Sequence, residues 1–596
     1  MAGTTDKEWT VMFYFASDNP LAPLVVSQIK AIKEAGFQED IDVLVHFDPM
    51  EKGVPTKLYN VNQKRKLHFR ECWEKDGKHP RSRIGDGNDS FVHDMIDDEV
   101  DPSDIPPEMQ AAMKSSATVP AEQSLREFVD FGINQHPARN YMLFLVGHGM
   151  IVGSDTFLPD DDPVSAITLK QLKEVVGRFS KNGKKLQLLS LHSCSMSSIE
   201  VAYQLRGLAS YMMATQGTAF VNSWPLRQIL KKTFNSVNRV KLDARKEARH
   251  IHRTADEATK RAQEELAANG AHVDVQELVE KLYFHCMFYC TDFITAGYSA
   301  DLALCNLDPN KMLGIKDPLQ KLIRRLKDHL SPRVSLVKDL ILLAHWDAQS
   351  FWEENYTDLN DFCRCLSRRC SDRAGVAQSA GDETTAKELV AVAKDCDDVS
   401  KVLNVVKSPD RAKRFSGLVI HAENFGSEYQ YASGLSIYFP WCEPLDDDPI
   451  VATSMEGQPE EPKTSGRSVS VKAKYAEYDF TVELDGDSWL SFLESYFLNT
   501  KREPPIVEDP DMYNEFRSDN KEISDATVFR LIKKAESSFN SVALKRTASE
   551  GADCKCPTIK NYPTDLNRGI KKFSITGGAL RAFQTDLECE PADDDN

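Results

Sequence analysis

Residues 186–205 read Leu-Gln-Leu-Leu-Ser-Leu-His-Ser-Cys-Ser-Met-Ser-Ser-Ile-Glu-Val-Ala-Tyr-Gln-Leu and predict a strand, a turn and a helix in succession. Leu186 to Leu191 is a short apolar run, as expected for a strand buried on both faces. Ser197 to Glu200 has the Ser-x-x-Glu spacing of a capping box, which predicts the start of a helix. Cys194 therefore lies where a parallel strand ends, at the sheet edge where α/β proteins bind ligands. Backbone N–H groups at a helix start would stabilise a thiolate there.

A second stretch has the same organisation. Tyr141 to Val146 is an apolar run that ends in Gly147, His148 and Gly149. If the two predicted strands are parallel neighbours, His148 and Cys194 lie side by side at one edge of the sheet. A cysteine and a histidine are the minimum for thiol nucleophilic catalysis. A lone cysteine or histidine is more often a packing residue, but two consecutive strand ends that deliver this pair favour a catalytic site.

Four motifs, in the same order along the chain, resemble the clostripain-like cysteine peptidases, which have the caspase-like fold. The matching residues are Tyr14-Phe15-Ala16-Ser17-Asp18-Asn19-Pro20-Leu21, His148-Gly149, Cys194 with Met196 and Glu200-Val201-Ala202-Tyr203-Gln204-Leu205, and Gly434-Leu435-Ser436-Ile437-Tyr438-Phe439-Pro440. The resemblance extends roughly from Trp9 to Pro440. It implies an α/β fold with a mostly parallel sheet flanked by helices, with helical insertions and a smaller C-terminal region.

The resemblance also implies an activity, that of a cysteine endopeptidase. Cys194 would attack the scissile carbonyl, and His148 would serve as general base and acid. The N–H groups of Gly149 and Cys194 would form the oxyanion hole. Because the expected location is intracellular, a digestive role is disfavoured, and we expect a regulated protease that acts on specific protein substrates after a trigger. Bacterial proteins with this fold act in defence and cell death, so the resemblance adds such a role, and an activating protein partner, as further expectations.

The sequence departs from the family at one position. Members carry an Asp two residues before the cysteine, in the pocket that pairs with Arg or Lys before the scissile bond, whereas this chain has His192. An imidazole is a poor partner for a guanidinium, so a preference for Arg or Lys does not follow. In the family the loop after the next strand forms a wall of the substrate cleft, which adds four candidate peptide contacts: Thr215, Gln216, Asn222 and Trp224. An ordinary strand-to-helix loop is the alternative.

Two other functions stay open at this point. A caspase-like scaffold without activity, acting as a binding or regulatory partner, agrees with His192 but not with the intact Cys194 and His148. Acyl transfer at the same thiol is a different chemistry for the same residues.

Composition narrows the class of protein. The chain has 596 residues and a formal charge of −18, which argues against nucleic acid as its main partner. It contains no apolar run near the roughly 20 residues that span a bilayer. Its start lacks the pattern of a secretory signal, which predicts a cytoplasmic protein with reduced cysteines. The cysteine spacing does not predict a zinc site. Asp160, Asp161 and Asp162 form a weak calcium candidate on a predicted loop; no other cofactor is expected.

The organisation along the chain predicts more than one unit. We predict a catalytic core at 1–235 with an exposed insertion at 74–120, a helical region with closing strands at 236–445, a linker at 446–470, a small α+β region at 471–585 and an acidic disordered tail at 586–596. Local patterns add a helix capped by Thr168, a strand at 299–307, paired strands at 415–421 and 435–439, a strand at 469–484 and a helix at 529–544.

Overall fold

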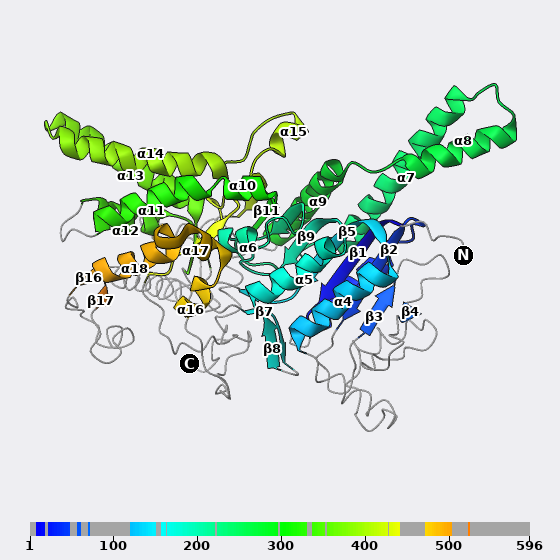
Figure 1. Ribbon diagram of the computed structural model, residues 1–596, viewed down its shortest axis with the longest axis horizontal. Helices are drawn as coiled ribbons and strands as arrows, with labels where there is room; N and C mark the ends of the chain where they lie inside the picture. Colours follow the sequence, from blue (N-terminus) through cyan, green and yellow to red (C-terminus); the bar gives the residue numbers. More distant parts are fainter. Residues whose placement is uncertain are drawn as a thin grey trace, which may run out of the picture.

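The structure is a computed structural model of the chain (Figure 1). It describes residues 7–17, 22–47, 57–60, 70–71, 120–150, 156–161, 164–220, 223–295, 299–330, 336–351, 355–426, 428–441, 471–502 and 523–524. The predicted insertion (except Pro120), the predicted linker, a helix predicted at 529–544 and the predicted acidic tail lie outside the described residues.

One large sheet organises the described chain. Its strand order is β14-β11-β10-β9-β5-β1-β2-β3-β4. The bounds are β1 Lys7–Phe15, β2 Ile41–Phe47, β3 Lys57–Asn60, β4 Arg70–Glu71, β5 Ala138–Val146, β9 Leu186–His192, β10 Tyr211–Ala214, β11 Ala300–Asn306 and β14 Val419–Phe425. The five central strands, β10, β9, β5, β1 and β2, pair in parallel. At one edge β11 and β14, and at the other edge β3 and β4, each join the preceding strand by antiparallel pairing. The chain reverses its direction across the sheet between β1 and β5, which makes the carboxyl end of β5 part of a topological switch point.

Helices cover both faces of this sheet, because its strands are apolar on both sides. On β5, Met142 and Phe144 belong to one hydrophobic cluster, and Leu143 and Leu145 belong to the other. The first cluster includes side chains of α1 (Ala22–Lys33), α7 (Leu226–Ile251) and α9 (Val275–Thr295). The second includes side chains of α4 (Ala121–Gln135), α5 (Leu169–Lys181) and α6 (Ile199–Gln204). The predicted fold class is confirmed.

Helical extensions lie at opposite ends of the molecule in Figure 1. One is formed by the outer part of α7 together with α8 (Glu257–Gly270). The other is formed by α13 (Leu359–Ser379) and α14 (Glu383–Leu403), which pack beside α11 (Lys316–Leu330) and α12 (Leu336–Asp347). The short helix α10 (Pro309–Leu313) follows β11 along the chain, and the short helix α15 (Arg411–Arg414) precedes β14.

Three small sheets complete the described structure. One contains β6 (Gly149–Met150), β7 (Thr156–Asp161) and β8 (Val164–Ile167). A second contains β12 (Ser350–Phe351), β13 (Tyr356–Asp358) and β15 (Ser436–Tyr438), and the third contains β16 (Lys501–Arg502) and β17 (Ile523–Ser524). Since Asp160 and Asp161 lie in β7, the prediction of a loop at these two residues is wrong.

Two further local predictions are wrong. The runs at 415–421 and 435–439 were expected to pair with each other, but β14 pairs with β11 and β15 pairs with β13. The alternating stretch at 469–484 was expected to be a strand, but it forms α16 (Val471–Ala476) and α17 (Asp479–Leu484). These helices bury Tyr475 and Phe480 against α6 and β15, and this packing outweighs the alternation of the sequence.

The C-terminal helices share the main core. Trp489 and Phe492 of α18 (Trp489–Asn499) contact Phe439, with ring centroids 5.3 and 5.5 Å apart. α7 crosses the boundary predicted at residue 235, and β11 and β14 extend the large sheet. The division into domains stays a prediction. Within the described residues, every helix is too short or too polar to span a membrane.

Candidate active site

Two adjacent parallel strands end at the site in matching register. Val146 of β5 pairs with His192 of β9, and the N–H of Gly147 donates to the carbonyl oxygen of His192 at 3.4 Å. His148 and Cys194 each follow two residues after this pair. They therefore leave the same edge of the sheet from neighbouring strands, as the sequence predicted.

The two turns are in direct contact at Gly149. A Cβ atom placed there would lie 2.6 Å from the Cβ of Ser193 and 3.2 Å from the carbonyl oxygen of Cys194. The first distance is shorter than real Cβ contacts and the second is tight, so a side chain at this position would force the two turns to shift. The His148 side chain is exposed and the Cys194 side chain is partly exposed.

The sulfur of Cys194 contacts the backbone of Ala219. The N–H of Ala219 donates to Sγ at 3.4 Å, and Sγ lies 3.8 Å from the carbonyl oxygen of the same residue. In the described structure these contacts come from the loop after β10, whereas the sequence led us to expect them from the start of α6. Burial raises the pKa of the Cys194 thiol, the Ala219 N–H opposes this shift, and the negative charge of Asp301 adds to it.

The turn that carries Cys194 is held by hydrogen bonds. The N–H of Ser195 donates to the carbonyl of Gly217 (3.0 Å), and the N–H of Ser197 donates to that of Thr215 (2.8 Å). Ser195 has a φ of +56°, in the left-handed region that non-glycine residues rarely adopt. These bonds to the loop after β10 hold the strained conformation in place.

The helix after the turn, α6, is buried and differs from the prediction at its start. Ser198, not Ser197, is the N-cap, and its hydroxyl accepts from the N–H of Val201. The Glu200 carboxylate does not close a capping box: it accepts from the Tyr438 N–H (2.9 Å) and the Tyr475 hydroxyl (2.8 Å). Burial raises the pKa of Glu200.

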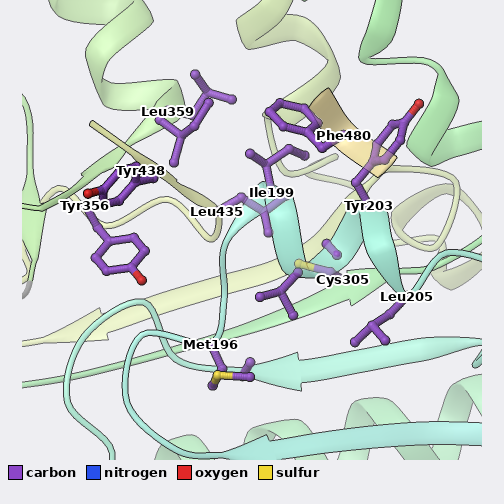
Figure 2. Packing of buried hydrophobic residues seen from close by; sticks show 14 of the residues in the cluster. Met196, Ile199, Tyr203, Leu205, Cys305, Tyr356, Leu359, Leu435, Tyr438 and Phe480 are labelled. Atoms are coloured by element: carbon purple, nitrogen blue, oxygen red, sulfur yellow. The ribbon is translucent and has the colours of Figure 1, made fainter. Parts of the chain in front are cut away.

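Figure 2 shows the surroundings of α6. Ile199 and Tyr203 of α6 lie beside Phe480 of α17, and Leu435 and Tyr438 lie on the β15 side. The helix that follows the proposed nucleophile is therefore enclosed by segments that come more than 200 residues later in the sequence.

His192 is buried behind the site. Its ring stacks on Trp224 with centroids 4.1 Å apart and an interplanar angle of 5°. Nε2–H donates to the carbonyl of Phe220 (2.7 Å) and lies 3.1 Å from the Ser223 hydroxyl. Nδ1 has no hydrogen-bond partner among the described residues. Burial lowers the pKa of His192 to about 3, so the ring is neutral at physiological pH.

The other predicted peptide contacts lie in the loop after β10. Thr215, Gln216 and Trp224 are buried. The Thr215 hydroxyl bonds to the carbonyl oxygens of Ser193 and Gly217, and the Gln216 side chain donates to Asp358. Asn222 lies outside the described residues. These positions shape the loop from within, and direct contact with a peptide stays a prediction.

Sequence reasoning missed three residues at the site. Ala219 contacts the sulfur through its backbone, which carries no sequence signal. Asp301 accepts from the N–H groups of Gln216 (2.6 Å) and Gly217 (2.9 Å), and Asp358 caps α13 and accepts from Ser433. An acid inside the apolar strand at 299–307 was a signal that could have identified Asp301.

The calcium candidate lacks a built site in the described residues. No group of three or more His, Cys, Asp or Glu side chains is placed there to hold a metal ion. Asp162 lies outside the described part of the chain, and calcium binding stays a prediction.

Comparisons with known proteins place the chain in a family. A search of curated proteins finds no match. An inactive zymogen C11 protease from Parabacteroides distasonis is 16% identical, with 73% of this chain and 93% of that chain covered and a TM-score of 0.39. A secreted C11 cysteine protease from Bacteroides thetaiotaomicron, iotapain, is 13% identical, with 81% and 100% covered and a TM-score of 0.42.

A second structure of a secreted C11 protease from Bacteroides thetaiotaomicron, in complex with an irreversible peptide inhibitor, is 13% identical, with 82% and 99% covered and a TM-score of 0.38. The model of the clostripain family, peptidase C11, matches residues 13–446, which is most of the chain and contains both strand ends of the site. The chain therefore belongs to the clostripain family of cysteine proteases.

Proposed function

We propose that the protein is an endopeptidase with a Cys194–His148 dyad. The observation that carries this proposal is the pairing of Val146 with His192, because His148 and Cys194 each follow this pair by two residues on neighbouring strands. His148 is exposed and Cys194 is partly exposed, on an edge of the sheet that a protein or peptide substrate could approach.

The chemistry assigns a step to each group. His148 takes the thiol proton, and the Cys194 thiolate attacks the scissile carbonyl carbon. The N–H groups of Gly149 and Cys194 stabilise the negative oxygen of the tetrahedral intermediate. His148 then gives its proton to the departing amine, and water hydrolyses the thioester to release the carboxylate.

Regulation is part of the proposal. Two observations support a resting site that needs a trigger: the Ala219 backbone contacts the sulfur, and burial raises the thiol pKa. A movement of the loop after β10 would expose the partly buried Cys194 further and admit a peptide. An activating partner, a cytoplasmic location and a role in bacterial defence or cell death stay predictions, which co-purification and cell fractionation would test.

The experiment compares Cys194→Ala, His148→Ala and the wild-type chain against a proteome-derived peptide library. We expect the two variants to lose cleavage by several orders of magnitude while their thermal unfolding stays unchanged. Cys370→Ala, a buried cysteine of α13, is the matched control and retains activity. A Cys194→Ala protein with wild-type cleavage would overturn the proposal.

A silent scaffold is the second candidate, and the raised pKa of Cys194 favours it. A peptide carrying an electrophile in place of the scissile bond separates the two functions. Adduct formation at Cys194, with new N-termini in the peptide library, supports the endopeptidase. A chain that forms no adduct and cuts no peptide under any activating condition supports the scaffold.

A further inference from the structure

Asp301 is a buried carboxylate on β11, which is separated from β9, the strand before Cys194, by β10. The residue is 3% exposed. It makes no ion pair in the described residues, and instead both oxygens accept backbone N–H groups, from Gln216 and Gly217. Removing a carboxylate from water is energetically costly. We therefore expect the contact between Asp301 and this main-chain turn to serve a function.

The turn held by Asp301 holds the nucleophile in its place. The carbonyl of Gly217 accepts from Ser195, and that of Thr215 accepts from Ser197, so residues on both sides of Cys194 are tied to the same three-residue turn. The adjoining Ala219 is the residue whose N–H contacts the sulfur. An unbroken path of hydrogen bonds thus leads from the Asp301 carboxylate to the backbone around Cys194.

We propose that Asp301 is a positioning residue of the active site, whose ionised carboxylate fixes the turn at residues 215–217 and thereby the strained backbone that carries Cys194. The kinetic part of this proposal rests on the proposed peptidase function. An ionised carboxylate accepts two N–H bonds strongly. A protonated carboxyl has one oxygen that must donate, so it cannot hold both N–H groups equally well.

The surroundings of Asp301 make its ionisation sensitive to pH. Burial raises the pKa of Asp301 to about 7, the Gln216 and Gly217 N–H groups oppose the shift, and the negative charges of Asp358 and Glu428 add to it. The titratable groups that interact electrostatically with Asp301 include Cys194, Tyr283, Asp358, Glu428 and Tyr429. The turn is therefore held most firmly above neutral pH.

Asp301→Asn tests the positioning role by kinetics. The amide keeps the shape of the side chain but presents at most one oxygen to the two N–H groups. We expect kcat to fall on the order of 100-fold, the usual effect of a nucleophile displaced by about 1 Å, with KM within about twofold and a thermal transition that shows a folded chain. A folded Asp301→Asn protein with wild-type kcat overturns the proposal.

Glu428→Gln is the matched control. It removes one negative charge near Asp301 and leaves both N–H bonds to Asp301 in place. We expect unchanged kcat above pH 8 and a pH–rate step near 7 that moves to lower pH, because Asp301 then ionises more easily. A step that stays in place contradicts the assignment to Asp301, and this result does not require Asp301→Asn to fold.

A labelling experiment keeps this inference separate from the proposed function. In a His148→Ala chain no imidazole of the dyad titrates and no peptide is cut, and the rate of Cys194 alkylation by iodoacetamide is followed from pH 5 to 9. We expect an inflection near pH 7 that disappears when Asp301→Asn is added. A pH profile of the alkylation rate that shows only the ionisation of the thiol refutes the role of Asp301. This conclusion holds whether or not the wild-type chain cleaves peptides.

Discussion

At the scale of single residues, the site depends on glycines, whose lack of a Cβ atom allows two close contacts. Gly149 allows the His148 turn to touch the Cys194 turn, and Gly217 lies where a Cβ would be 2.4 Å from the Tyr429 ring. Both glycines are required by close approach. The site tolerates almost no added volume at these points.

Gly149→Ala tests the contact between the two turns. The added methyl group would overlap Ser193 and the backbone of Cys194, so the turns must separate. We expect kcat to fall by roughly 100-fold with a loss of stability of about 1–3 kcal/mol from overpacking. Steady-state kinetics and urea unfolding measure the two effects. Gly375→Ala in α13, where a Cβ would meet open space and φ is not positive, controls for the replacement of a glycine that makes no close contact.

His192 predicts a pH dependence of stability. Its folded pKa of about 3 is lower than the unfolded value of 6.5, so the unfolded state binds more protons between these values and stability rises with pH through this window. The free energy of unfolding that depends on the neutral His192 ring is fully present above pH 6.5. It is lost as pH falls toward 3, with an upper limit of about 5 kcal/mol. Urea unfolding of wild type and His192→Gln should show a difference at pH 7 that shrinks at pH 4. A difference in unfolding free energy that is the same at pH 7 and pH 4 would contradict the lowered pKa of His192.

At the scale of elements, α6 connects the nucleophile to the C-terminal part of the chain. Its buried Glu200 accepts from β15 through Tyr438 and from α16 through Tyr475. At the other end of the helix, Gln204 exchanges hydrogen bonds with Asp479. Arg206 adds ion pairs to Asp479 and Glu483. Six residues of helix would not be stable alone; these contacts hold them.

Glu200→Ala and Glu200→Gln separate shape from hydrogen bonding at α6. The alanine variant leaves the Tyr438 N–H and the Tyr475 hydroxyl buried without an acceptor, at about 1–3 kcal/mol for each group. The glutamine variant retains one acceptor oxygen, and since burial already favours the neutral acid, it should cost less. Thermal unfolding of both variants checks the order. Equal losses would mean that the carboxyl oxygen is not the relevant group.

At the scale of the whole molecule, the hydrophobic core continues beyond the matched family region. The family match ends at residue 446, but Trp489, Phe492 and Tyr496 of α18 pack on Phe439. The indole N–H of Trp489 also donates to the carbonyl of Tyr438 at 2.7 Å. These contacts join α18 to the strand that borders α6.

Trp489→Ala tests whether this unit unfolds with the rest. We expect a loss of about 3–5 kcal/mol and one calorimetric transition that moves as a whole. Leu498→Ala, on the same helix at a residue that is 65% exposed, is the control and should change stability by less than about 0.5 kcal/mol. Two transitions, of which only one moves, would show that the C-terminal helices form an independent domain.

The sequence by itself determined the elements whose signal is local. The apolar runs that end at Val146 and Leu191 predicted β5 and β9, and the reactive residues after them predicted the site, because strand period and chain order need no distant contact. It also located the N-cap of α5 at Thr168. It failed at Val469 to Leu484, where burial against α6 decides the structure, and at Glu200, whose partners come from far along the chain.

Only the tertiary structure decided what surrounds the sulfur. Ala219 contacts it through backbone atoms, which any residue supplies, and Asp301 reaches the 215–217 turn from a strand added after three intervening helices. The burial of His192 on Trp224 likewise sets its pKa, which no neighbouring residue in the sequence encodes. Local patterns specify which groups reach the edge of the sheet; long-range packing specifies their hydrogen bonds and charge, because desolvation depends on what the folded chain places around them.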